Sequence, residues 1–124
     1  MPIRSFTELV AWKRSHSLVI DVYKITKSFP NEERFGLTDQ LRRAVVSVSS
    51  NIAEGFNKRT SADKNHFYSI ALGSVAEIQN QLLISRDLNY LKNDIFQILG
   101  RHTVEVHKLV NALMKSSKTK AENT

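Results

Sequence analysis

The sequence predicts an all-α protein folded as an up-down-up-down four-helix bundle. Its 124 residues contain only two prolines and four glycines, which leaves little material for the turns of a sheet. Apolar residues recur at steps of three and four in four long segments, as they do on amphipathic helices. Four such helices joined by short connections alternate in direction and bury their apolar stripes together.

The first helix is expected from about Ser5 to Ser28. It opens with Ser5-Phe6-Thr7-Glu8, a capping-box pattern in which a serine hydroxyl and a glutamate carboxylate satisfy free amides of the first turn. Phe29-Pro30 ends it, because proline disfavours helical geometry in the residue before it. The core stripe consists of Ala11, Leu18, Val22 and Ile25, with Trp12, Val19 and Tyr23 beside it.

The second helix is expected over residues 39–54, although Val46 to Ser49 alternate as in a strand. Thr38 is predicted to be its N-cap and Gly55 its left-handed C-terminal cap. The helical interpretation rests on an apolar face made of Leu41, Ala44, Val45, Val48, Ile52 and Gly55.

The third helix is expected to begin after Thr60-Ser61 and to end near Asn89-Tyr90. Its predicted core face consists of Phe67, Ile70, Ala71, Ser74, Ile78, Leu82 and Leu88. The fourth helix is expected from Asn93-Asp94, with a near-heptad stripe of Ile95, Leu99, His102, Val106, Leu109 and Leu113. We therefore predict a bundle domain at residues 1–114 and a disordered basic tail at residues 115–124. The side chains expected to be buried include Trp12, Leu41, Val48, Phe67, Ile78, Leu99 and Val106.

Composition restricts the partners and the compartment. The formal net charge is +6, which favours a polyanionic partner such as RNA or DNA. The chain has no cysteine, no apolar signal core and no apolar run long enough to cross a bilayer. We therefore expect a cytoplasmic protein without a disulfide framework and without a membrane partner.

Several segments together resemble the four-helix-bundle proteins of the 23S ribosomal RNA intervening-sequence family. The segments are Trp12, Phe29-Pro30, FGLTDQLRRA at 35–44, NIAEG at 51–55, Phe67, ALGSVAE at 71–77 and Gln81-Leu82. The resemblance spans roughly residues 5–113 and implies a helical bundle without a defined reaction. It also implies similarity to the accessory proteins of diversity-generating retroelements, which form basic pentameric barrels.

Two rows of residues suggest a homo-oligomer. On the third helix, Tyr68, Leu72, Val75 and Leu83 form a second apolar stripe beside the predicted core face. On the second helix, the small residues Val46, Ser49 and Ala53 lie opposite the core. The alternative is an ordinary surface with isolated apolar residues. The resemblance alone supplies the number of subunits, a homopentameric ring.

A polar cluster is expected near the junction of the second and third helices. Asn51 is a poor residue for a helix interior, and it lies at the edge of the core stripe. We interpret Asn51, Glu54 and Glu77 as a structural polar clamp between the helices. A catalytic role is disfavoured, because no nucleophile or ordered acid-base pair accompanies them.

The sequence argues against an enzyme and against a metal site. The candidate ligands for a metal held inside a bundle are His16, Glu54, Glu77, His102 and Glu105. They lack the paired Glu-x-x-His spacing of such sites, and glycine-rich phosphate loops and nucleophile elbows are also absent. We therefore expect no catalytic residue, no cofactor and no metal.

The predicted function is nucleic-acid binding through backbone phosphates. The candidate binding residues are Arg42, Arg43, Lys58, Arg59, Lys13, Arg14 and Lys64, with the tail lysines in addition. An oligomer would repeat each cluster, so weak phosphate contacts would sum. For a single residue, the alternative is a solvated helix face or an ion pair. The alternative function is an oligomeric protein-binding scaffold or an accessory protein for a nucleic-acid enzyme.

Overall fold

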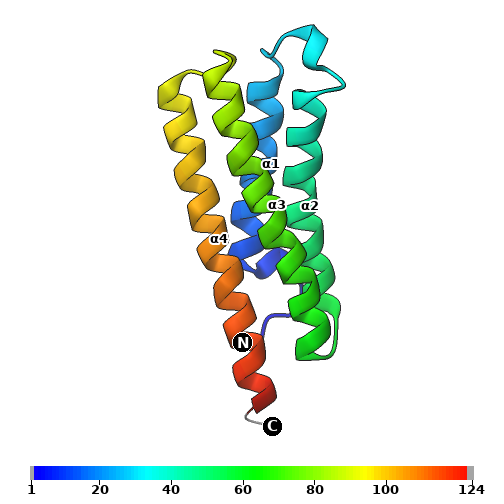
Figure 1. The fold of residues 1–124 in the computed structure, drawn as a ribbon. Coiled ribbons are helices and arrows are strands. Elements are labelled where there is room, and N and C mark those ends of the chain that lie inside the picture. The colour runs from blue at the N-terminus through cyan, green and yellow to red at the C-terminus, as the bar shows by residue number, and fades with distance from the viewer. Residues whose placement is uncertain (1, 123–124) are drawn as a thin grey trace.

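The computed structural model describes residues 2–122, with side chains through residue 118, and contains no strand in that range. Four long helices lie side by side and alternate in direction, so the predicted all-α four-helix fold is confirmed (Figure 1). One 3₁₀ turn precedes α1, and a second lies in the connection from α1 to α2. The elements are η1 (Phe6–Glu8), α1 (Val10–Thr26), η2 (Asn31–Glu33), α2 (Leu37–Asn57), α3 (Ser61–Asp87) and α4 (Asn93–Glu122).

Each helix packs against its neighbours in the sequence, and α1 also packs against α4, which closes the bundle. We call the end at which α2 ends and α3 begins the lower end, as it is drawn in Figure 1. The N-terminal segment and the last turns of α4 lie at the same end. The connections from α1 to α2 and from α3 to α4 lie at the upper end.

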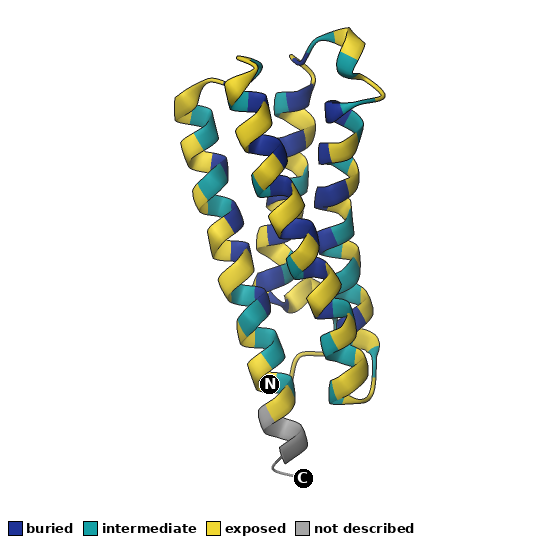
Figure 2. Cartoon of the chain, viewed as in Figure 1, coloured by how far each residue is buried: buried dark blue, intermediate teal, exposed yellow. Residues whose placement is uncertain are grey.

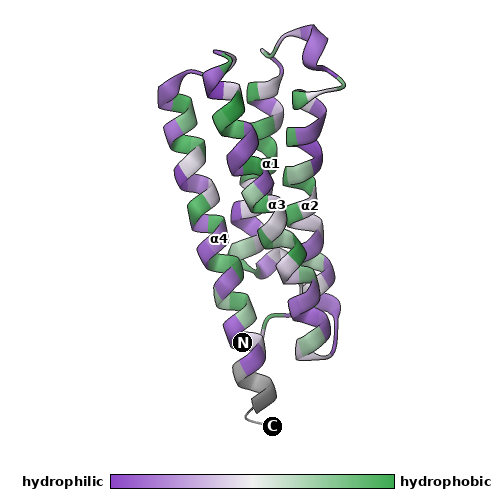
Figure 3. Ribbon diagram, viewed as in Figure 1, coloured by the Kyte–Doolittle hydropathy of each residue, from purple (hydrophilic) through white to green (hydrophobic). Residues whose placement is uncertain are grey.

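The core runs along the inner faces of all four helices (Figure 2), and hydrophobic and hydrophilic residues alternate around each helix (Figure 3). Five of the seven side chains chosen from the sequence are buried, namely Leu41, Val48, Ile78, Leu99 and Val106. The other two, Trp12 and Phe67, are half-buried. Trp12 still packs against the core.

The capping pattern at the N-terminus caps a 3₁₀ turn, and α1 begins only at Val10. The Ser5 hydroxyl accepts a hydrogen bond from the Thr7 backbone N–H at 3.2 Å. The Glu8 carboxylate accepts one from the Arg4 backbone N–H at 2.9 Å. The predicted start at Ser5 was therefore too early. These polar side chains accept hydrogen bonds from backbone amides in and just before η1, and α1 begins only after this turn.

Helix α2 is longer at both ends than predicted. Its N-cap is Gly36, and Thr38 is a buried residue inside the first turn. The Glu33 carboxylate accepts a hydrogen bond from the Leu37 N–H at 3.3 Å, so a side chain of η2 satisfies a free amide of α2. Tyr90 donates its hydroxyl hydrogen to the other Glu33 oxygen at 3.0 Å, and this hydrogen bond raises the pKa of Tyr90.

Gly55 does not end α2, because it lies within the helix and no glycine of the described chain has a positive φ. Its role is close packing. A Cβ added to Gly55 would lie 2.6 Å from Cε1 of Tyr68 and 3.1 Å from the Lys64 carbonyl oxygen, both on α3. Gly55 is therefore required where the Tyr68 ring lies directly against the α2 backbone.

The core face of α3 is rotated from the predicted one. The buried stripe consists of Tyr68, Ala71, Ser74, Val75, Ile78, Gln81, Leu82 and Ser85, at steps of three and four. Ile70 and Leu88, which were expected in the core, are 41% and 49% exposed. The prediction is confirmed for Ala71, Ser74, Ile78 and Leu82. It was wrong for Phe67, Ile70 and Leu88, because α3 carries apolar residues on more than one side and Tyr68 rather than Phe67 lies against Gly55.

Helix α4 buries Leu99, Thr103, Val106 and Val110 and continues to Glu122. It therefore passes through most of the stretch that was expected to form a tail. Near its end, Ser117 donates a hydrogen bond to the Ser61 hydroxyl oxygen at 3.1 Å, which ties α4 to the start of α3. Residues 123–124 lie outside the described part.

Gly55→Ala should lower the free energy of unfolding by about 1–3 kcal/mol, because the new methyl group overpacks against Tyr68. Gly73→Ala is the matched control, since a Cβ on this helical glycine would meet nothing within 4 Å. That change should raise the stability by up to about 1 kcal/mol. Urea unfolding followed by circular dichroism measures both, and equal effects of the two substitutions would contradict the packing argument.

Candidate nucleic-acid interface

Arg42 is a structural contact between α1 and α2. Its Nε donates a hydrogen bond to the Thr26 hydroxyl at 2.9 Å, and its guanidinium lies 4.6 Å from the centre of the Tyr23 ring. One terminal nitrogen also donates to the Tyr23 carbonyl oxygen at 3.4 Å. A cation in this place is favourable because it meets the carbonyl end of α1. The structure therefore places Arg42 in the subunit itself rather than among freely exposed cations.

Arg43, Arg14 and Lys13 lie on exposed helix surfaces away from the lower connection. Arg43 forms an ion pair with Asp39 at 2.9 Å and remains 81% exposed. Arg14 on α1 pairs with Glu105 on α4 at 3.1 Å. Lys13 is exposed next to it. Exposed pairs of this kind contribute little to stability, so Arg43 and Arg14 can exchange their partners for a phosphate at small cost.

Lys58, Arg59 and Lys64 meet at the lower end. Lys64 donates a hydrogen bond from Nζ to the Phe56 carbonyl oxygen at 2.6 Å, so it caps the end of α2. Nζ of Lys58 lies 3.9 Å from a Glu54 carboxylate oxygen and 5.1 Å from the centre of the Phe67 ring. Arg59 is exposed and makes no hydrogen bond or ion pair with any side chain that the structure describes.

A cavity of about 500 Å³ opens beside these residues. Its polar lining includes Arg59, Lys64 and three serines, and its apolar lining includes Leu9 and Phe56. Tyr68 contributes a third kind of group, a buried phenol, and burial raises the pKa of this tyrosine. The sequence does not predict this cavity, because its walls come from the N-terminal segment, the α2–α3 junction and the last part of α4.

The polar clamp forms with different partners than expected. Asn51 donates from its side-chain amide to the Ser47 carbonyl oxygen at 2.8 Å, within its own helix. The Ser47 hydroxyl is hydrogen-bonded to the Ser74 hydroxyl at 2.8 Å, and this pair joins α2 to α3. Glu54 pairs with Lys58 instead, and Glu77 is exposed. Two small hydroxyl groups make the clamp, because they fit where the two helices lie close together.

The apolar stripe expected to face a partner subunit is mostly internal. Tyr68 and Val75 are 3% and 0% exposed within the single chain, and Leu72 is half-buried. On α2, Val46 is 40% exposed and Ala53 is half-buried. The expectation for Tyr68 and Val75 was wrong for the same reason as the rotated core face. The apolar residues of α3 that face outward are Ile70, Leu83, Ile84 and Leu88.

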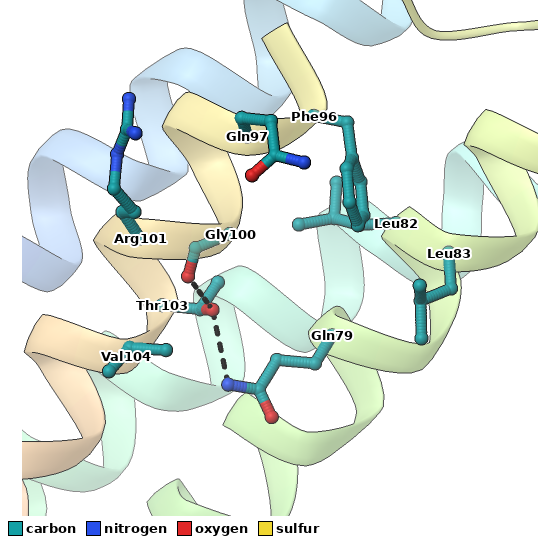
Figure 4. A pocket seen from close by; sticks show the side chains of 9 residues that line it. All are labelled: Gln79, Leu82, Leu83, Phe96, Gln97, Gly100, Arg101, Thr103 and Val104. Atoms are coloured by element: carbon teal, nitrogen blue, oxygen red, sulfur yellow. Dashed lines mark hydrogen bonds between the residues drawn. The ribbon is translucent and has the colours of Figure 1, made fainter. Parts of the chain in front are cut away.

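A second cavity, of about 410 Å³, is a groove between α3 and α4 (Figure 4). Leu82, Leu83, Phe96 and Val104 line it, and Gly100 leaves its middle open. A single polar link crosses it, in which Gln79 donates a hydrogen bond to Thr103 at 3.2 Å. In the sequence, Gly100 is a helix-interior glycine of the kind that can mark a close approach, but Gly73 is another and does not line the groove.

The residues considered for a metal site are dispersed. His102 contacts the Arg14 carbonyl oxygen at 2.9 Å, and its other ring nitrogen lies 3.7 Å from Asp21. His16 stacks on Trp12 within α1. Among the described residues, no group of three possible ligands gathers. None of the described helices is long and apolar enough to cross a membrane.

The comparison with protein families gives one match. Residues 7–112 match the model of the 23S rRNA-intervening sequence protein family. The chain belongs to this family. The match begins in η1 and ends in α4, so it takes in the whole α2–α3 connection and all the candidate cations outside the last turns of α4.

A solved structure of similar fold supports the arrangement of this family member. It is a protein of unknown function from the S23 ribosomal protein family of Bacteroides thetaiotaomicron, with 22% sequence identity and a TM-score of 0.79. The likeness covers 86% of this chain and 96% of that one. A comparison with curated proteins finds no match.

Proposed function

We propose that this protein is a non-enzymatic, homo-oligomeric bundle that binds RNA or DNA through backbone phosphates with little sequence preference. The observation that carries the proposal is the concentration of cations at the lower end. Arg59 lies exposed in the short connection between α2 and α3, with Lys58 beside it and Lys115 and Lys118 on the exposed side of α4. Cations on long side chains near one another are the usual means of contacting phosphates.

The balance of charge differs between the two ends. Near the lower end, the acidic side chains that the structure describes are Glu8, Glu54 and Asp63, and Glu54 is already paired with Lys58. At the upper end, the cations are interspersed with Glu32, Glu33, Asp39, Asp87 and Asp94. Among the described side chains, the lower end has six lysines and arginines against these three acids, whereas the upper end has seven against five. This asymmetry favours the lower end as the surface that attracts a polyanion.

A homo-oligomer would multiply these contacts. The groove between α3 and α4 is the surface that best suits a contact between subunits, since Leu83 and Val104 are 42% and 46% exposed there. Gly100 lets another helix approach the α4 backbone closely. The resemblance to pentameric accessory proteins is the ground for proposing a homopentamer.

The same groove supports the second candidate function, a scaffold that docks a protein such as a nucleic-acid enzyme. Its lining is largely apolar, so a partner bound there would bury hydrophobic area. Binding of that kind withstands moderate salt, whereas phosphate binding weakens steeply as salt is added. Salt dependence therefore separates the two functions.

A salt titration with fluorescent single-stranded RNA and duplex DNA tests the nucleic-acid proposal. Log affinity should fall linearly with log salt, with a slope of about 0.7 per neutralised phosphate on single strands and about 0.9 on duplex DNA. The double substitution Lys58→Gln/Arg59→Gln should weaken all sequences alike and flatten the slope. Arg43→Gln at the other end of α2 is the control and should change both quantities less. Absence of binding at low salt would refute the proposal.

Light scattering on the purified protein tests the oligomer. We expect the mass of several subunits at micromolar concentration, and Leu83→Glu should reduce it because it places a charge inside the groove. Leu88→Glu is the matched control, since Leu88 is 49% exposed at the end of α3 and does not line the groove. Circular dichroism should show unchanged helix content for both. A monomeric wild-type mass would remove the proposed oligomer.

A further inference from the structure

The cavity at the lower end is lined by both cationic and apolar groups. The N-terminal segment contributes Ile3, the end of α2 contributes Phe56, and α4 contributes Leu113 and Ser116. Arg59 lies at its rim in the connection. No carboxylate of the described residues lines this cavity, so it is unsuited to a metal ion or an amine and suited to an anion that carries an apolar body.

Tyr68 gives an independent indication of a ligand. It is 3% exposed, lines the cavity, and makes no hydrogen bond within the described residues. Its hydroxyl oxygen is not among the buried unpaired atoms, so this oxygen keeps a small solvent contact, and a polar atom of a ligand could take the place of water there. Long side chains on a helix point toward its N-terminus, which for α3 is the lower end. The hydroxyl is therefore directed to the end at which the cavity opens.

The start of α3 supplies further hydrogen-bond donors. Ser61 is the first residue of the helix, and the Thr60 hydroxyl accepts from Asp63 N–H at 3.1 Å, which leaves the earlier amides of the turn without that cap. Asp63 is exposed in the same turn and does not line the cavity. The negative charge of Asp63 repels an anion, and the positive charge of the Arg59 guanidinium offsets this repulsion. A helix N-terminus next to an arginine suits a phosphate group.

We propose that this cavity binds one nucleotide, with its phosphate at Arg59 and the start of α3 and its base between the apolar walls. A volume of about 500 Å³ lies within the usual range for small organic ligands. Tyr68 hydrogen-bonds a polar atom of the sugar or base. The nucleotide is either free or the end of a bound strand, and the second source rests on the proposed function.

Isothermal titration calorimetry with AMP and UMP tests the site, with adenosine and inorganic phosphate as partial ligands. The two nucleotides should bind, and each partial ligand should bind about tenfold more weakly or worse, since it keeps only one half of the contacts. Tyr68→Phe removes only the hydroxyl and should weaken AMP binding by about 3- to 10-fold. Ser116→Phe, on the exposed rim, should obstruct part of the cavity and weaken AMP binding.

Ser69→Phe is the matched control, because Ser69 is a helix serine at the surface of α3 that does not line the cavity. This variant should bind AMP as the wild type does, and thermal unfolding should show that all three variants are folded. The proposal is overturned if AMP does not bind at millimolar concentration, or if it binds Ser116→Phe or Tyr68→Phe as tightly as the wild type.

Two further arms separate this site from the proposed function. A single strand with a 5′-phosphate should bind more tightly than the same strand with a 5′-hydroxyl if strand ends occupy the cavity. Equal binding of the two strands together with AMP binding assigns the site to free nucleotides. Polynucleotide binding with the expected salt dependence, but without AMP binding, would sink the nucleotide site and leave the proposed function standing. AMP binding without polynucleotide binding would support the nucleotide site and refute the proposed function.

Discussion

The contact between Gly55 and the Tyr68 ring is the constraint on which the lower end of the bundle depends. Because Gly55 has no side chain, the aromatic ring lies against the α2 backbone, and α3 lies close to α2. The Ser47–Ser74 hydrogen bond continues this close packing farther along the same pair of helices. Small residues on α2 thus fix the position of α3, and the buried stripe of α3 starts at Tyr68.

The candidate chemistry of the lower end follows from this packing. With α3 held close to α2, the connection between them needs only residues 58–60, and it carries Lys58 and Arg59 at the surface. Lys64 reaches the last carbonyl oxygens of α2, so one lysine is used to end a helix and the neighbouring arginine is left exposed. Tyr68 lines the cavity. The same residue therefore serves the core and the proposed nucleotide site.

The sequence predicts the helices well because their apolar periodicity is long and their connections are short. It predicts the rotation of α3 poorly, because apolar residues such as Ile70, Leu83 and Ile84 lie outside the core and obscure the stripe. The function of Gly55 could not be read from one chain segment, since a glycine near a helix end fits a cap as well as a close contact. The spatial context, a tyrosine on the next helix, decides between them.

In the candidate site, too, the sequence predicts local features but not contacts between helices. The sequence identifies the basic clusters but not the partners of each cation. Arg42 is held by Thr26 and Tyr23 of α1, whereas Arg59 is exposed. The lower cavity and the groove between α3 and α4 are formed by residues distant in sequence, so no local pattern predicts them. Gly100 lies inside a helix with open space beside it, but Gly73 shares this feature without lining the groove, so a helix glycine alone does not locate it.

A double-mutant cycle between Gly55 and Tyr68 tests this constraint most directly. Gly55→Ala is compared in the wild type and in a Tyr68→Val background, which lacks the ring atoms that the new methyl group would meet. The Lys64 carbonyl oxygen remains near the methyl group in both backgrounds. We expect the loss of about 1–3 kcal/mol in the wild type to fall by at least half in the Tyr68→Val background, because the smaller side chain relieves the overpacking. An equal loss in both backgrounds would contradict the account.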